Sequence, residues 1–292
     1  MKEDKFQYQI SDGCISCEKC KIVCPANAIT VGLVHMEINK EKCIDCGTCS
    51  IVCPTGAASA GNTIRESLIL NNIEKDKLYL NAGCAISEYK PYLPPLMYEL
   101  LKQYYPTIQM HNTCCRHNPG LPEGSTIIAN CGGCDRRFRS LYNGVNTVSF
   151  WEILDSLENP NLPDYRGMSV TVHDSCGYRH KPQVHKAIRS LLYKMNIEVI
   201  EAEYHGTISV CCGDNFYGLV SNDNVEKRIK VRADQMPCEN VVVYCIGCVR
   251  AMQSGGKKPF HLLDLIFQRK SEPMLDTLDE YHNRLNRYIE EH

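Results

Sequence analysis

Nineteen cysteines among 292 residues, most of them in short fixed spacings, restrict the folds open to this chain more than any other feature. Two runs share the pattern C-x2-C-x2-C-x3-C-P: "CISCEKCKIVCP" at residues 14–25 and "CIDCGTCSIVCP" at residues 43–54. Thiols at this spacing let a short loop wrap one metal centre, and the proline turns the chain away after the last ligand. The runs therefore predict metal-binding loops near the N-terminus.

The same pattern resembles the bacterial two-cluster ferredoxins, in which the fourth cysteine of each run crosses to the other cluster. The resemblance covers residues 12–60 and implies an α+β ferredoxin-like domain, residues 1–60, with two cubane [4Fe–4S] clusters. The implied ligands are Cys14, Cys17, Cys20 and Cys53 for one cluster, and Cys43, Cys46, Cys49 and Cys24 for the other. Between the runs, "ITVGLVHMEIN" at residues 29–39 predicts a short hairpin. A pair of zinc knuckles is the alternative, although zinc gives no reason for two matching C-P runs.

The remaining composition points to a reducing compartment. The formal net charge is −2, which gives no strong basic field for nucleic acid or an anionic membrane. The first residues, "MKEDKFQYQISDG", contain no apolar leader segment, and no run approaches the ~18–20 apolar residues of a spanning helix. We therefore expect a soluble cytoplasmic protein whose cysteines bind metal rather than form disulfides.

After residue 60 the chain alternates short apolar runs with amphipathic stretches, which predicts an α/β region with a largely parallel sheet. Residues 61–76 are expected to be a linker with one helical turn, and residues 270–292 a C-terminal amphipathic helix, docked on this chain or used against a partner. The expected strands are residues 77–83, 126–130, 168–175, 197–202, 207–210 and 240–245. The expected helices are residues 94–105, 134–142, 182–195, 224–236 and 260–270.

The cysteines of this region fall twice in the same order: a single cysteine, an adjacent pair and then a C-x2-C. The first series is Cys84, Cys114, Cys115, Cys131 and Cys134, and the second is Cys176, Cys211, Cys212, Cys245 and Cys248. Internal duplication on this scale predicts two pseudo-symmetric repeats, residues 77–166 and 167–269. Most of these cysteines directly follow a predicted strand, so each series can converge at the carboxyl ends of the strands.

The second repeat is similar to the cysteine-rich CCG domain of the heterodisulfide reductase B subunit, which has relatives in glycolate and lactate oxidases and in anaerobic glycerol-3-phosphate dehydrogenase. The segments "VHDSCGYR", "SVCCGDNFYG" and "VVVYCIGC" stand where that family has its ligands. The resemblance covers residues 77–269 and implies that each complete series holds a noncubane [4Fe–4S] cluster, in which one thiolate bridges two irons. Such a cluster explains the adjacent cysteines, because its iron sites are spaced so that neighbouring residues each reach one. The fusion to a ferredoxin domain is similar to the D-type subunit, or to joined C and B subunits.

The first repeat departs from the family pattern. Arg116 stands where the second repeat has Gly213, whose backbone freedom helps the chain turn beside the paired cysteines. The stretch between the pair and the C-x2-C covers residues 116–130, against residues 213–244 in the second repeat. The prediction is therefore one or two noncubane clusters, with a cubane or a zinc site as the alternative in the first repeat. Cys238 belongs to neither series and is expected to be a buried or partly buried thiol.

Histidines and arginines close to the cluster cysteines are candidates for supporting roles. A histidine there can hydrogen-bond a sulfur or donate a proton to a leaving thiolate, or be only a satisfied strand-end residue. The histidines are His111, His117, His173 and His180, and His173 is the catalytic candidate among them. An arginine can offset cluster charge or hold an anionic substrate, with surface ion pairing as the alternative. The arginines are Arg116, Arg136, Arg137 and Arg179.

The resemblance implies an iron–sulfur oxidoreductase component of a kind that functions in anaerobic metabolism. Electrons from a flavoprotein, a ferredoxin or a hydrogenase-type subunit would pass through the cubanes to the noncubane clusters and reduce a small-molecule disulfide. The catalytic candidates, acting through their clusters, are Cys114, Cys115, Cys211 and Cys212. No G-x-G-x-x-G motif follows a strand, so another subunit must supply the electrons and we expect a hetero-oligomer. The alternatives are a non-catalytic electron-transfer subunit of a flavin dehydrogenase or an electron-bifurcating complex, and a zinc-bound scaffold.

Overall fold

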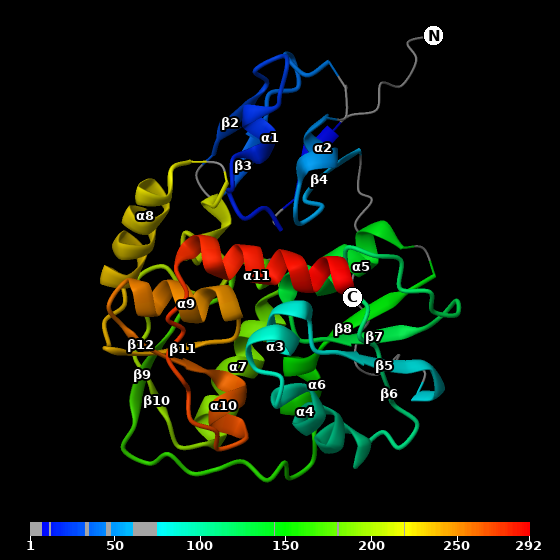
Figure 1. Ribbon diagram of the computed structural model, residues 1–292, viewed down its shortest axis with the longest axis vertical. Helices are drawn as coiled ribbons and strands as arrows, with labels where there is room; N and C mark the ends of the chain where they lie inside the picture. Colours follow the sequence, from blue (N-terminus) through cyan, green and yellow to red (C-terminus); the bar gives the residue numbers. More distant parts are fainter. Residues whose placement is uncertain are drawn as a thin grey trace.

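A small N-terminal module sits above two α/β lobes that lie side by side, and one long C-terminal helix crosses both lobes below the module (Figure 1). The structure is a computed structural model that describes residues 8–11, 13–32, 35–44, 48–60, 75–142, 144–179, 181–218 and 220–292. Residues 61–74 of the predicted linker lie outside the described residues. Within the part of the chain that the structure describes, no helix is both long and apolar enough to cross a bilayer.

The N-terminal module (residues 8–60) is built from two antiparallel strand pairs and two short helices. Strand β1 (Tyr8–Ile10) pairs with β4 (Ala58–Ala60). Strand β2 (Ile29–Val31) pairs with β3 (Met36–Ile38), so the two strands of the predicted hairpin are present. Helices α1 (Lys19–Ile22) and α2 (Thr48–Val52) each begin inside one of the cysteine runs, and each carries a buried cysteine.

The first lobe is a parallel sheet of four strands in the order β6-β5-β7-β8. The strands are β5 (Leu78–Asn81), β6 (Gln109–Met110), β7 (Thr126–Ala129) and β8 (Asn146–Ser149). The helices are α3 (Cys84–Tyr89), α4 (Leu93–Lys102), α5 (Gly132–Leu141) and α6 (Phe150–Ser156). β5 and β7 were predicted, whereas β6, β8, α3 and α6 were not.

The second lobe has a parallel sheet with the same arrangement, β10-β9-β11-β12, in which the first strand again lies between the second and the third. The strands are β9 (Ser169–Val172), β10 (Glu198–Val199), β11 (Asn240–Val243) and β12 (Lys258–His261). The α-helices are α7 (Pro182–Lys194), α8 (Asn222–Asp234), α9 (Ile246–Ser254) and α10 (Leu262–Ile266). Short 3-10 turns are η3 (Cys176–Tyr178), η4 (Gly206–Ile208) and η5 (Asp214–Phe216). The predicted parallel α/β region is therefore present.

Helix α9 and strand β12 of the second lobe were not predicted, and two predicted elements differ from the structure. Residues 207–210 do not form a strand: the chain makes the turn η4, and the Ser209 hydroxyl donates to the Asp174 carbonyl. Ile208 and Val210, which gave the strand pattern, are exposed rather than packed in a sheet. The helix expected from residue 260 begins only at residue 262, because β12 pairs with β11 through residue 261.

Helix α11 (Leu278–Glu291) is the C-terminal helix of the prediction, and it docks on this chain. A capping box starts it: the Thr277 hydroxyl accepts from the Glu280 amide while the Glu280 carboxylate accepts from the Thr277 amide. Its apolar side chains Leu278, Tyr281 and Ile289 are buried. The helix packs on α3, where the Tyr89 hydroxyl donates to the Tyr281 carbonyl at 2.9 Å.

Candidate iron–sulfur centres

The N-terminal module brings Cys14, Cys17, Cys20 and Cys53 together; we call these residues the inner four-cysteine set. Burial raises the pKa of Cys20 to about 12, and the nearby sulfurs of Cys14, Cys17 and Cys53 add to that shift. Backbone amides point at these sulfurs: the Ser16 amide lies 3.3 Å from Cys14 Sγ, and the Ala58 amide 3.4 Å from Cys53 Sγ. N–H groups aimed at a sulfur stabilise thiolate ligands, so the loop suits a negatively charged cluster.

The outer four-cysteine set comprises Cys24, Cys43, Cys46 and Cys49. Cys46 lies outside the described residues. The other three line one small cavity, whose remaining walls are apolar or aromatic side chains. The Ala28 amide donates to Cys24 Sγ at 3.3 Å. The structure thus groups the three described members as the sequence predicted.

In the second lobe, five cysteines form a continuous chain of sulfur contacts in the order Cys176, Cys211, Cys212, Cys248, Cys245. We call them the second five-cysteine set. The sulfurs of Cys176 and Cys211 are 3.8 Å apart. The adjacent pair reaches in two directions, since Cys211 contacts Cys176 whereas Cys212 contacts Cys248. All five lie just beyond the carboxyl ends of β9 and β11 or on the loop that ends at Gly213.

The first lobe repeats this chain of contacts in the order Cys84, Cys114, Cys115, Cys134, Cys131, which we call the first five-cysteine set. Here too the adjacent cysteines contact different neighbours. Hydrogen bonds from Cys115 and then Cys84 lower the pKa of Cys114 to about 2, whereas its bond to Cys114 raises the pKa of Cys84. A thiophilic metal binds the thiolates, so its binding releases the protons of these crowded, buried thiols to solvent. An all-sulfur donor set suits iron–sulfur clusters or zinc. Five sulfurs exceed the four ligands of a zinc site, so the donor sets fit clusters better.

Asn215 is a candidate supporting residue that sequence reasoning missed. Its side-chain Nδ2 lies 3.3 Å from Cys176 Sγ and 3.5 Å from Cys211 Sγ, so one amide serves two sulfurs of the second set. The signal was available, because both adjacent pairs read C-C-x-x-N. In the first lobe the corresponding Asn118 is exposed instead, and its Oδ1 accepts from the Gly120 amide.

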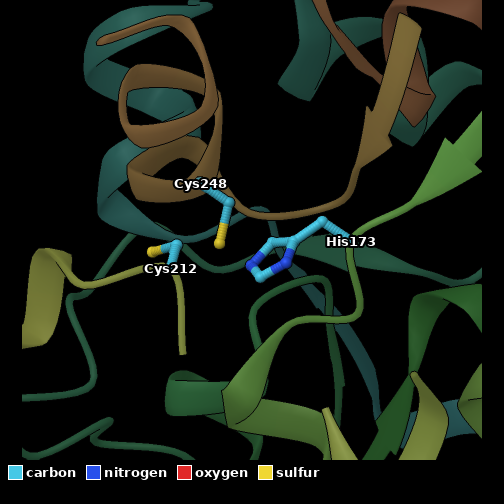
Figure 2. Close-up of side chains that lie close together, drawn as sticks. All are labelled: His173, Cys212 and Cys248. Carbon is cyan, nitrogen blue, oxygen red and sulfur yellow. The ribbon is translucent and has the colours of Figure 1, made fainter. Parts of the chain in front are cut away.

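His173 faces the second five-cysteine set, as predicted for a supporting residue. An imidazole nitrogen and the sulfurs of Cys212 and Cys248 lie within 4.8 Å of one another. His173 directly follows β9, Cys212 lies on a loop and Cys248 in α9, and Figure 2 shows the three side chains close together. Arg232 Nε donates to His173 Nδ1 at 3.3 Å, which leaves Nε2 as the protonated nitrogen of a neutral ring. Burial, followed by the charge of Arg232, lowers the pKa of His173 to about 3. The ring is therefore neutral, and its buried Nε2 has no hydrogen-bond partner among the described residues.

The other predicted histidines do not act on sulfurs among the described residues. His111 Nε2 lies 3.1 Å from the Pro119 carbonyl, and its Nδ1 is 3.3 Å from Asn81 Nδ2. His117 Nε2 lies 2.7 Å from the carbonyl of Ile289 in α11. His180 lies outside the described residues. Cys238 is partly buried, as expected.

The predicted arginines divide into two groups. Arg116 is exposed, and Arg137 is 3.5 Å from the Pro54 carbonyl. Arg136 and Arg179 are buried at the junction with the N-terminal module, so the surface ion-pairing interpretation is wrong for these two. Arg179 Nη1 donates to the Cys14 carbonyl at 2.8 Å, and Arg136 Nη1 donates to the Gly13 carbonyl.

The sulfur sites lie next to one another. Cys17 of the inner set packs in the same buried cluster as four members of the second five-cysteine set: Cys176, Cys211, Cys212 and Cys248. The two lobes meet backbone to backbone, since a Cβ on Gly132 would lie 2.6 Å from the Gly177 carbonyl carbon. Among the described residues of the N-terminal module, the inner set is therefore the one that shares a buried cluster with cysteines of the second lobe.

A cavity of about 910 Å³ opens between the N-terminal module and the second lobe. Cys211 and Gly213 form part of its wall, with Ile15 from the module opposite. None of its lining residues belongs to the first five-cysteine set. Access from this cavity therefore leads to the second set.

Comparison with protein-family models gives separate matches in the N-terminal module and in the second lobe. Residues 13–57 match a 4Fe-4S dicluster domain, and residues 170–253 match a cysteine-rich domain, CCG. Residues 77–166 lie outside both matches. No curated protein matches the chain.

The fold, the sulfur sites and these matches together define an iron–sulfur electron-transfer protein. More particularly, the chain joins an N-terminal 4Fe-4S dicluster domain to a CCG cysteine-rich domain, the arrangement that the sequence resemblance predicted.

Proposed function

We propose that this chain is a heterodisulfide-reductase-like oxidoreductase component that takes electrons from a partner protein and reduces a disulfide. The observation that carries the proposal is the repeated contact order of five sulfurs in both lobes, with the second set bordering a large cavity. A pure relay needs no cavity beside its last centre, so the cavity favours a substrate. The partner is a flavoprotein, a ferredoxin or a hydrogenase-type subunit in a hetero-oligomer, and the proposed location is the cytoplasm.

The proposed ligands follow the geometric sets. The inner and outer four-cysteine sets hold one cubane [4Fe–4S] cluster each, and each five-cysteine set holds a noncubane [4Fe–4S] cluster. The two lobes are proposed to be pseudo-symmetric repeats, which is supported by their shared strand order and by the position of Cys84 and Cys176 after the first strand of each sheet. When bound, the clusters would supply single electrons, and Cys211 of the second five-cysteine set lines the cavity.

The cavity gives the substrate disulfide a route to the second five-cysteine set. Its walls carry the exposed apolar side chains of Val210 and Val231, and its rim carries Lys227 and Arg228. Arg228 lies over the Phe216 ring at 4.1 Å, which fixes the cation at the edge of the apolar wall. Such a site holds the apolar part of a disulfide substrate while the S–S bond of the substrate lies against Cys211.

The reaction breaks one S–S bond with two electrons and two protons and yields two thiols. The electrons come from the partner protein through the N-terminal module, and the protons come from water at the open side of the cavity. Asn215 directs its side-chain amide at the sulfurs of Cys176 and Cys211, and the buried ring of His173 lies beside those of Cys212 and Cys248, so both help to hold the ligand side of the site in one geometry. Arg232 fixes the tautomer of His173, with the ring proton on Nε2.

The test uses anaerobically reconstituted, reduced protein and a panel of small-molecule disulfides, with released thiol as the readout. Cys211→Ser and Cys212→Ser should abolish thiol release and alter the paramagnetic spectrum of the thiol-treated oxidised protein, while sparing both cubane signals. Cys238→Ser is the matched control, because Cys238 is a partly buried thiol outside every set, and it should behave as the parent protein. Metal analysis should find about 16 irons per chain, against about 8 if only the N-terminal sets were filled.

Two outcomes would overturn the proposal. Unchanged spectra in both serine variants would remove the five-ligand assignment and the disulfide mechanism with it. No thiol release from any disulfide, together with rapid electron exchange with a flavoprotein, would identify a non-catalytic electron-transfer subunit instead.

A further inference from the structure

Two buried arginines, one from each lobe, hold the loop that begins the inner four-cysteine set. Arg136 follows Cys134 in α5 and donates to the carbonyl of Gly13. Arg179 follows η3 and donates to two carbonyls: that of Cys14 at 2.8 Å and that of Ser209 at 2.9 Å. Both guanidinium groups are thus fixed beside the backbone of the first ligand, and Arg179 ties that ligand to the loop that carries Cys211.

The positive charge of Arg136 lies near cysteines of the inner four-cysteine set. Arg136 is 1% exposed, and Cys53 and Cys14 of the inner set are among the groups that act on its charge. The nearest carboxylate, Asp135, already bonds Arg139 at 2.9 Å and Lys181 at 3.1 Å. An arginine guanidinium keeps its charge in a protein, so Arg136 places a buried positive charge beside the inner cysteines.

The outer four-cysteine set has a different surrounding. The cavity that its described members line is walled by Tyr8, Ala26, Ala28, Ile29, Ile38 and Ile44, none of which is charged. The lysines nearby in sequence, Lys21, Lys40 and Lys42, are exposed, so water and salt screen them. The described part of this set thus has no buried cation like Arg136 beside it.

We infer that Arg136 and Arg179 make the cluster of the inner four-cysteine set the one with the higher reduction potential in the N-terminal module. Reduction adds negative charge to a cluster, and a buried cation stabilises that charge far more than a solvated one does. An electron that enters the module therefore settles on the inner set, whose Cys17 packs against the second five-cysteine set. The arginines are positioning residues that give electron transfer its direction, and this role does not depend on the disulfide proposal.

The test is a potentiometric titration of the full-length, cluster-loaded protein, followed by paramagnetic resonance and without any disulfide present. Arg136→Gln and Arg179→Gln keep an N–H donor and remove the charge. Each should lower the ratio of reduced to oxidised inner cluster at a fixed potential by about tenfold, which corresponds to about 59 mV for one electron. Arg136→Lys and Arg179→Lys retain the charge and should recover most of the loss. A Cys20→Ser variant identifies the inner signal.

Arg250→Gln is the matched control. Arg250 stands two residues after Cys248, as Arg136 stands two residues after Cys134, but it pairs with Glu226 and Asp214 rather than with the N-terminal module. It should leave both cubane potentials unchanged. The inference is overturned if neither glutamine variant moves the inner potential, if the outer potential moves equally, or if the lysine variants fall as far as the glutamine variants. Because both arginines are tested separately, loss of folding in one variant leaves the other to decide.

Discussion

The two lobes present five sulfurs in the same contact order, but they cover those sulfurs in different ways. In the second lobe, the stretch after Gly213 contains α8, whose Val225, Ile229 and Ala233 pack in one buried cluster with Cys211 and Cys212. In the first lobe, the corresponding stretch is short and has no helix. The order of the cysteines follows from their positions near the strand ends, whereas the side chains that bury the cysteines come from other segments of the chain.

The first lobe takes its cover from the far end of the chain. Ile289 of α11 is buried in the cluster that contains Cys114 and Cys115, and Leu285 packs against it. The amide of Cys114 donates to the His292 carbonyl at 3.2 Å. The first set is thus closed by a helix that also contacts the second lobe, where the Tyr217 hydroxyl donates to Asp279 at 2.8 Å. One helix therefore couples the two sites, and the comparison can be tested from either side.

The largest effect is expected from Ile229→Ala. Ile229 is fully buried, and truncating such a side chain costs about 2–5 kcal/mol. The variant should lower the free energy of unfolding by that amount and weaken the noncubane signal of the second set, with the first set intact. Denaturant unfolding followed by circular dichroism measures the first quantity, and paramagnetic resonance the second.

Ile289→Ala is the matched variant of the first lobe. It should weaken the signal of the first set and spare that of the second, with a smaller loss of stability because it lies near a helix end that can adjust. If either variant weakens the signals of both sets equally, the two sets are not buried by separate side chains, and the difference between the lobes described above is contradicted.

A smaller effect is expected from replacing, with alanine, the residue that follows each adjacent cysteine pair. Gly213 has φ of +107°, and a Cβ there would lie 3.0 Å from both the amide nitrogen and Cγ1 of Ile229. Gly213→Ala should therefore cost about 1–3 kcal/mol through backbone strain and contact with α8. Arg116 is exposed, and its φ is not in the left-handed region, so Arg116→Ala should change stability by no more than about 0.5 kcal/mol. Thermal unfolding of both variants checks this, and equal losses would contradict it.

Sequence reasoning predicted the parts of this molecule that depend on the spacing of cysteines and apolar residues along the chain. The cysteine runs, the repeated series and the apolar runs of β5, β7, β9 and β11 follow local patterns, and the structure brings the described cysteines together as expected. The edge strand β6 has too few residues for a period to show, and the strand predicted at residues 197–202 is reduced to the two residues of β10. The strand expected at residues 207–210 failed because its apolar residues face a cavity instead of a sheet.

Contacts between distant segments could not be predicted. Nothing in the sequence near Arg136 or Arg179 indicates that their partners are carbonyls at residues 13 and 14. The closure of the first set by Ile289 likewise depends on where α11 docks. Asn215 belongs to an intermediate class: the C-C-x-x-N spacing is visible in the sequence, but only the fold separates its role from that of Asn118.

The smallest expected effect, and the one that bears most directly on how alike the two sets are, comes from Asn215→Leu. Leucine keeps the volume of the side chain and removes the Nδ2 donor that lies 3.3 Å from Cys176 Sγ and 3.5 Å from Cys211 Sγ. An N–H donor favours the more negative, reduced state of a thiolate-bound centre, and one hydrogen bond is worth about 1 kcal/mol. The ratio of reduced to oxidised second set should therefore fall about fivefold at a fixed potential. Asn118→Leu is the control, because Asn118 is exposed and its Oδ1 accepts from its own loop, and it should leave the first set unchanged. If the two asparagine variants change the reduction potentials of the two sets equally, this asparagine acts through the loop conformation in each lobe. If only the potential of the second set changes, two sites with the same ligand order differ in potential because only one of them receives this amide.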